Sequence, residues 1–151
     1  MTVQEVFDIA IYLIDSQNES TGSTNTSDTK EYALRTPGLI NSILDQVYPA
    51  SDTYTPAVNG VRSTLPSVTS MEDNLDLDDY VCRNVMPYGL AGLLLTEENP
   101  TMANFMWQTY LENLQTAKNG MPTEIGSVED VYGCGSGMYG GIEYGWFSRW
   151  V

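Results

Sequence analysis

The sequence predicts an all-α protein, a small bundle of about four to five helices with long loops and an irregular, Gly- and aromatic-rich C-terminal tail. Three observations favour this fold: helix-capping residues precede two segments, apolar residues recur at helical spacing, and residues 85–95 are almost entirely apolar. A chain of 151 residues buries roughly two-thirds of its unfolded surface. We therefore expect one domain, 1–151, with a helical body over 1–120 and a tail over 121–151.

The first helix has a complete start signal. Thr2 and Glu5 have the spacing of a capping box, and Met1 and Val6 stand at the two positions of a hydrophobic staple. The expected buried face comprises Val3, Val6, Ala10, Leu13 and Ile14. Residues 16–29 are mostly Ser, Thr, Asn and Asp without apolar periodicity, which predicts a mobile loop.

The second helix is expected to begin at Asp28, because Glu31 follows three residues later. Its apolar stripe comprises Tyr32, Leu39, Ile40, Ile43 and Val47. Pro37 lies inside that stripe and predicts a kink or two short helices, and Pro49 ends the segment. Residues 50–74 predict an extended loop or a loose hairpin around Asn59-Gly60, and loops of this length are often functional.

A third helix is predicted over residues 76–96, with an interruption near Pro87. Residues 89–95 are apolar on nearly every side, which is typical of a buried helix or one in a subunit contact. Gly89 and Gly92 would each cost about 1 kcal/mol in an exposed helix. We therefore expect another element to pack closely against both glycines.

The fourth helix has Asn99 as its cap, Pro100 in its first turn and Gly120 just beyond its end. Its expected inner face comprises Met102, Phe105, Met106, Thr109, Leu114 and Ala117. Trp107 and Tyr110 widen this stripe beyond what one partner helix would cover. In the tail that follows, aromatic residues stand among glycines, so it either covers its own core or orders against a neighbour.

Composition excludes several functions. The net charge is −14, and the six basic residues are scattered singly, whereas phosphate binding needs clustered cations. The acidity indicates either solubility or a surface that repels nucleic acid passing close by. The chain has no histidine, which removes Ser-His-Asp and Cys-His catalysis and His-ligated metals.

Three further patterns fail as cofactor or metal sites. The acidic run from Asp73 to Asp79 lacks the glycine and glutamate of a calcium loop, so we interpret it as capping the third helix. Residues 135–140 match GxGxxG, but only 11 residues follow and no helix pattern is among them. Cys82 and Cys134 cannot make a zinc site without histidine, and we expect Cys82 to pack as a reduced, small apolar residue. No cofactor or metal is expected.

Localisation follows from two other features. The N-terminus lacks the basic region of a signal peptide, and the longest apolar run is about half of the ~20 residues that span a bilayer. We expect a soluble, cytosolic chain without membrane contact.

What remains is an interaction surface. Tyr, Met and Trp are enriched at protein interfaces, and the chain contains ten, seven and three of them. The candidate interface residues are Leu90, Leu93, Leu94, Trp107, Tyr110, Tyr139, Tyr144, Trp146, Phe147, Arg149 and Trp150.

One family shares this pattern. Residues 86–95, MPYGLAGLLL, with Glu97-Glu98-Asn99 and residues 105–111, resemble the LPxGLAxLLLxEE pattern of small head–tail connector (adaptor) proteins of tailed bacteriophages and prophages of Gram-positive bacteria. The ending, DVYG and then YGGIEYGWFSRW, is similar to C-termini of the same group. The resemblance covers about half of the chain and leaves out residues 16–29 and 50–74.

The resemblance implies an all-helical, non-enzymatic virion structural protein. Such a protein assembles as a ring homo-oligomer on the portal, joins the capsid to the tail and lines the DNA passage. Its partners would be its own copies, the portal protein and tail-completion proteins, with DNA passing without specific binding. It would occupy the virion neck, and the host cytoplasm during assembly. A negative lumen would let DNA slide, because few cations are present to bind phosphates.

Two other classes compete with this interpretation. A cytosolic acidic protein-binding module or regulator, unrelated to phages, could mimic DNA or hold a peptide in a helical groove. It predicts a stable monomer or dimer that binds a basic partner tightly. A small enzyme would need carboxylates with raised pKa values in a defined cleft. We expect the chain not to be an enzyme.

Overall fold

The computed structural model describes residues 1–15, 19–57 and 59–120. In these ranges the elements are α1 (Val3–Leu13), α2 (Lys30–Val47), the 3-10 helix η1 (Tyr48–Ala50), α3 (Asp79–Asn84), α4 (Met86–Leu94) and α5 (Pro100–Asn119). The described residues contain no strand, only an isolated antiparallel bridge between Thr2 and Asn74. The predicted all-α fold with four to five helices is confirmed.

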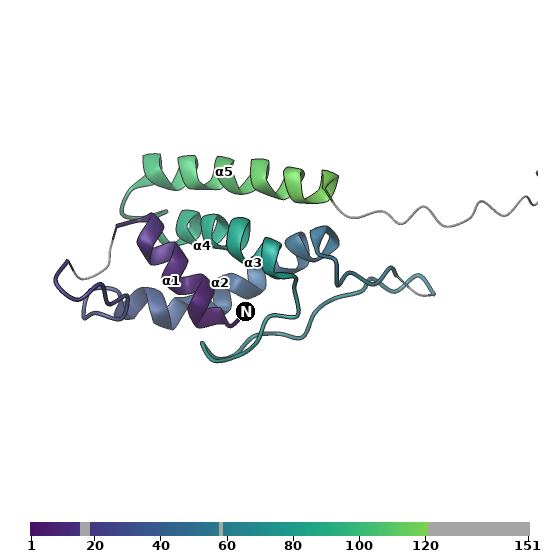
Figure 1. The fold of residues 1–151 in the computed structure, drawn as a ribbon, viewed down its shortest axis with the longest axis horizontal. Coiled ribbons are helices and arrows are strands. Elements are labelled where there is room, and N and C mark those ends of the chain that lie inside the picture. The colour runs from purple at the N-terminus through teal and green to yellow at the C-terminus, as the bar shows by residue number, and fades with distance from the viewer. Residues whose placement is uncertain (16–18, 58, 121–151) are drawn as a thin grey trace, which may run out of the picture.

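The helix α4 lies at the centre of the bundle. It packs against α5 on one side and against α1 and α2 on the other, with α3 directly before it (Figure 1). Seven of its nine residues are buried, as the all-round apolar sequence predicted. The expected interruption of the third helix falls at Val85, between α3 and α4, and Pro87 stands in the first turn of α4.

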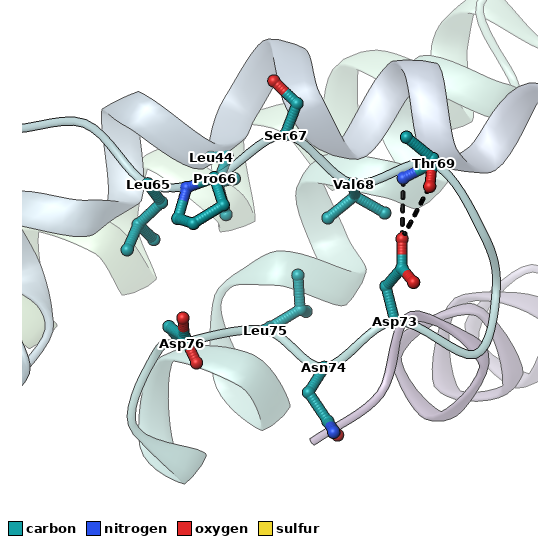
Figure 2. A pocket seen from close by; sticks show the side chains of 10 residues that line it. All are labelled: Leu44, Leu65, Pro66, Ser67, Val68, Thr69, Asp73, Asn74, Leu75 and Asp76. Atoms are coloured by element: carbon teal, nitrogen blue, oxygen red, sulfur yellow. Dashed lines mark hydrogen bonds between the residues drawn. The ribbon is translucent and has the colours of Figure 1, made fainter.

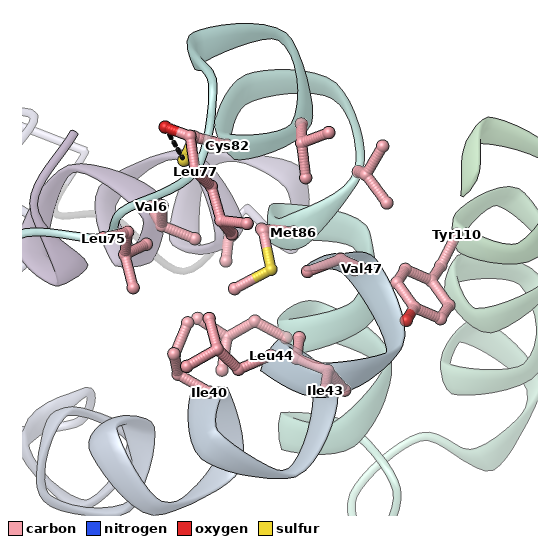
Figure 3. Close-up of a cluster of buried hydrophobic side chains, with 14 of the residues drawn as sticks. Val6, Ile40, Ile43, Leu44, Val47, Leu75, Leu77, Cys82, Met86 and Tyr110 are labelled. Carbon is pink, nitrogen blue, oxygen red and sulfur yellow. Dashed lines mark hydrogen bonds between the residues drawn. The ribbon is translucent and has the colours of Figure 1, made fainter. Parts of the chain in front are cut away.

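The core gathers around the side chain of Met86. Figure 3 shows this methionine between the apolar face of α2, which includes Ile40 and Leu44, and residues that precede α3, such as Leu77. From α5, Tyr110 enters the same core. Both Met86 and Tyr110 have no exposed surface. The core therefore draws on every helix of the described chain.

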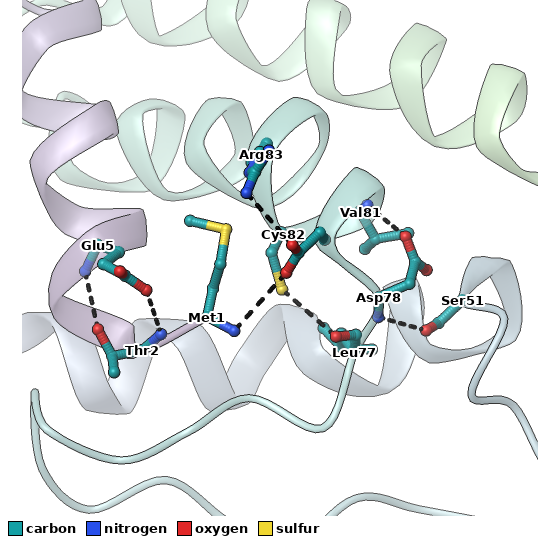
Figure 4. A network of polar contacts seen from close by, with 10 residues as sticks. Met1, Thr2, Glu5, Ser51, Leu77, Asp78, Val81, Cys82 and Arg83 are labelled. Atoms are coloured by element: carbon teal, nitrogen blue, oxygen red, sulfur yellow. Dashed lines mark hydrogen bonds and ion pairs between the residues drawn. The ribbon is translucent and has the colours of Figure 1, made fainter.

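Side-chain caps begin three helices, and α3 begins at Asp79, three residues after the predicted residue 76. In the capping box of α1, the Glu5 amide donates to Thr2 Oγ1 at 3.3 Å and the Thr2 amide donates to Glu5 Oε2 at 2.8 Å (Figure 4). The Val81 amide donates to Asp78 at the start of α3, at 3.0 Å. The Met102 amide donates to Asn99 at the start of α5, at 3.1 Å. These caps are local, so sequence spacing predicts them.

The helix α2 differs from the sequence expectation. It begins at Lys30 with Thr29 as the N-cap residue, and the buried Thr29 hydroxyl does not cap the helix but donates to the carbonyl of Thr24. Pro37 does not divide α2 into two helices. A proline removes one backbone donor, and the remaining hydrogen bonds and the packed inner face sustain the helix through it.

The buried faces of two helices also differ. In α1, Phe7 and Ile11 are fully buried, whereas Leu13 and Ile14 are only partly covered. The inner face of α5 comprises Ala103, Met106, Tyr110, Leu114 and Ala117. The prediction that Met102 and Phe105 point inward is therefore wrong, and the reason lies in how α5 meets α4.

The contact of α5 with α4 is made over two glycines. A Cβ atom on Gly89 would lie 2.9 Å from Tyr110 Cδ2 and 3.2 Å from Ile43 Cδ1. A Cβ atom on Gly92 would lie 3.3 Å from the Ala103 carbonyl oxygen and 3.3 Å from the Trp107 amide nitrogen. The glycines let the two helices approach closely, so the expected close packing is confirmed. This contact turns Ala103 and Tyr110 inward and leaves Phe105 outside.

The substitution Gly89→Ala tests this packing. We expect it to lower the free energy of unfolding by about 1–3 kcal/mol, because the new methyl group overlaps the buried ring of Tyr110. The matched control is Gly38→Ala in α2, where no atom lies within 4 Å of the new Cβ. The control should leave stability unchanged or raise it by up to about 1 kcal/mol. Urea denaturation measures both, and equal stability of the two variants would contradict the packing argument.

The segment that follows η1 forms a loose hairpin, as predicted. Asn59 and Gly60 have φ angles of 53° and 76°, which an Asn-Gly turn requires. The hydroxyl oxygens of Thr55 and Ser63 lie 3.0 Å apart and join its two sides. Residues 54–57 and 59–64, called the arm below, extend away from the helices in Figure 1.

After the arm, the chain is hydrogen-bonded to α2 and α1. The Asn41 side chain donates to the Val68 carbonyl at 2.7 Å and accepts from the Val68 amide at 2.8 Å. The Val3 amide donates to the Asp73 carbonyl at 3.0 Å. The long loop is therefore ordered by side chains and backbone of the helical body.

Candidate docking surface

The predicted interface residues divide into three groups. Leu90, Leu94 and Tyr110 lie in the core with at most 1% of their surface exposed, so the closed bundle offers none of them to a neighbour. Leu93 and Trp107 are half-buried at the edge of the core. The other six, Tyr139, Tyr144, Trp146, Phe147, Arg149 and Trp150, lie outside the described residues.

Large apolar side chains stand on both flanks of α5. Met102 and Phe105, three residues apart, lie on one flank, and Trp107 and Leu111, four apart, lie on the other. Phe105 is 59% exposed, Leu111 48% and Met102 36%. These four residues, with Leu93 of α4, are called the α5 surface below.

A shallow groove of about 150 Å³ borders the α5 surface at Leu93 and Trp107. It runs between α4 and α5, and its lining is Gly92, Leu93, Thr96, Pro100, Ala103, Asn104 and Trp107. The indole of Trp107 packs against the buried Tyr110 ring, with centroids 4.8 Å apart. The core thus holds the wall of the groove in place, and a fixed aromatic side chain loses little entropy when a partner binds.

The described residues carry their negative charge at the surface. Every Asp and Glu in the described part of the chain is exposed or half-buried. Ion pairs there join Arg83 to Asp79 at 3.2 Å and Arg35 to Glu31 at 3.8 Å, and the N-terminal amino group to Asp79 at 3.9 Å. Such exposed pairs contribute little to stability, and they leave most of the chain's charge of −14 facing solvent.

The acidic run before α3 has two roles. Asp78 caps α3, as predicted, and the Ser51 hydroxyl oxygen accepts from the Asp78 amide at 3.0 Å (Figure 4). Asp73 instead holds a turn, because the amides of Thr69 and Ser70 donate to its Oδ2 at 2.8 and 2.9 Å. These backbone donors lower the pKa of the Asp73 carboxyl. The prediction that Asp73 belongs to the helix cap is wrong.

Two buried groups with shifted pKa values belong to the core. Burial raises the pKa of the Cys82 thiol to about 11, and Cys82 is a free cysteine, as expected. Burial also raises the pKa of Tyr110 to about 12. The described residues contain no group of three or more Cys, Asp or Glu that could hold a metal ion. None of their helices combines the length and apolarity needed to cross a membrane.

Comparison of the chain with protein-family models, with curated proteins and with solved structures finds no match. The function is therefore inferred from the surfaces of the described chain. Sequence reasoning identified Leu93 and Trp107 but missed Phe105 and Leu111 as exposed residues. For Leu111, the signal was its position four residues after Trp107 on an otherwise polar face.

Proposed function

We propose that the chain is a non-enzymatic head–tail connector of a tailed bacteriophage or prophage. In this proposal it assembles as a ring on the portal, joins the capsid to the tail and lines the DNA passage in the virion neck. The observation that carries the proposal is the α5 surface, where both flanks of a 20-residue helix expose large apolar side chains. Exposed apolar patches of this kind mark protein–protein contact sites.

The resemblance to connector proteins supports the same proposal. Its pattern of residues 86–95 and 105–111 falls on α4 and α5 and on the chain between them. The glycine of the pattern, Gly89, lies where Tyr110 of α5 packs against α4, and this packing determines which residues of α5 remain outside. The shared residues therefore shape the candidate docking surface as well as the core.

The negative charge of the chain supports the proposal that the ring lines a DNA passage. A ring of copies that each carry a net charge of −14 would repel phosphates and hold few cations that could bind them. Assembly into a ring also makes modest contacts sufficient, because each copy binds two neighbours and the portal at once. The proposal thus requires no single interface of high affinity.

Deletion of residues 133–151 tests the role proposed for the tail. We expect the truncated chain to keep the helical circular dichroism and the unfolding midpoint of the full chain, because the described helices already share one buried core. Particles assembled with it should fail to join heads to tails. Infectious particles with the truncated chain would contradict the role of the tail.

Negative-stain microscopy of the full chain, mixed with the portal protein of its phage, tests the function itself. The expected result is an added ring beneath the portal. A chain that adds no density to the portal and binds a basic protein as a stable monomer or dimer would contradict the proposal and favour an acidic regulator.

A further inference from the structure

A second groove, away from the α5 surface, lies between two extended segments. Residues 65–69 form one rim and residues 73–76 the other, and the cavity between them has a volume of about 360 Å³ (Figure 2). Leu44 of α2 joins Leu65 and Leu75 in lining it. The groove therefore combines apolar side chains with two stretches of backbone.

Backbone groups on both rims lack partners. The Val3 amide donates to the Asp73 carbonyl, and the Leu75 amide donates to the Met1 carbonyl at 2.9 Å. In an antiparallel bridge of this pattern, the N–H and C=O of the residue between these bonds, Asn74, point to the opposite edge. Within the described chain they make no hydrogen bond, and neither do the backbone groups of Ser67 on the other rim. An edge of this kind accepts an extended segment of another chain.

The arm has the complementary chemistry. Among residues 54–57 and 59–64 the one charged residue is Arg62, which is exposed and has no ion pair within the described chain. Its neighbour Val61 is 69% exposed, although it is apolar. The charged residues that line the groove, Asp73 and Asp76, are both acidic. In a chain with few cations, a basic residue on a projecting arm is an unusual placement.

We propose that the arm of one copy docks into the groove of the next copy, with Arg62 beside Asp76 and Val61 on the apolar side chains. The arm and the groove are different surfaces, so the contact is head-to-tail. Head-to-tail contacts generate a ring when the rotation between copies closes. This inference rests on the proposed function, because it assigns the contact between subunits of the proposed ring.

A charge exchange tests the contact. Arg62→Glu and Asp76→Arg are each expected to reduce ring formation on the portal at least tenfold, because each places like charges together in every arm–groove contact. The double variant restores opposite charges and should recover ring formation. Asp76 is the choice for exchange because the Asp73 side chain also holds the turn at residue 69.

Controls carry the same charge changes elsewhere. Lys30→Glu matches Arg62→Glu, and Asp28→Arg matches Asp76→Arg; both positions are exposed and lie outside the arm, the groove and α5. Negative-stain counting of rings and circular dichroism are recorded for all variants. Undiminished rings from the single variants, or a folded double variant that does not recover, would overturn the arm–groove contact while the proposed function stands. Absence of rings from the unaltered chain would instead overturn the proposed function, and this inference with it.

Discussion

Tyr110→Ala is expected to lower the free energy of unfolding by about 3–5 kcal/mol. The Tyr110 ring has no exposed surface and fills the space over Gly89, where it also approaches Ile43. It also packs against the indole of Trp107, with ring centroids 4.8 Å apart. Removing it leaves a cavity at the junction of α2, α4 and α5, which the glycine at the contact cannot fill.

The matched control for this substitution is Tyr110→Phe. It removes only the hydroxyl group, whose hydrogen bond to Gln46 Oε1 is long at 3.4 Å, so we expect a loss of less than about 1 kcal/mol. Urea denaturation followed by circular dichroism gives both values. An alanine variant as stable as the phenylalanine variant, but unable to join heads to tails, would show that Tyr110 acts in docking.

Local signals in the sequence predicted the starts of α1 and α5. Thr2 with Glu5, Asp78, and Asn99 each bond to an amide three residues away, so no distant part of the chain decides these contacts. The Asn59-Gly60 turn is local in the same sense, because its backbone angles require those residue types. The fold class follows from such signals together with apolar periodicity.

The orientation of α5 depends on residues distant in sequence. Periodicity alone allows a face with Phe105 inside, since aromatic residues are normally buried. The structure selects the face with Ala103 and Tyr110, because only small residues and a flat ring fit against the glycines of α4. The same limit applies to Asp73, whose partners Thr69 and Ser70 lie in a segment for which the sequence predicts only an extended loop or a loose hairpin.

Only part of the candidate docking surface was therefore accessible to sequence analysis. The sequence predicts Trp107 and Leu93 because they stand in segments with more apolar residues than one helix contact would bury. Phe105 and Leu111 become candidates once the inner face of α5 is known, because both lie outside that face and are exposed. The groove beside Asn74 depends on a bridge to Thr2, a contact between residues more than seventy positions apart, which no local pattern contains.

Phe105→Asp is expected to weaken docking to the portal by about thirtyfold or more without unfolding the chain. A large aromatic side chain at the centre of an interface contributes about 2 kcal/mol or more to binding, and about 1.4 kcal/mol corresponds to a tenfold change in affinity. The side chain is 59% exposed in the isolated chain, so its replacement should change the free energy of unfolding by less than about 0.5 kcal/mol. Sedimentation of the variant with portal rings measures the loss.

Gln108→Asp is the control that separates apolar contact from added charge. Gln108 is exposed on the same helix and lies one turn from Phe105, so the variant places an identical carboxylate on the outer side of α5 while the aromatic ring stays. If apolar contact drives docking, Gln108→Asp should bind the portal several-fold more tightly than Phe105→Asp. Equal weakening by the two variants would show that the portal responds to the charge of α5, and unimpaired docking of Phe105→Asp would exclude this flank of α5 from the interface.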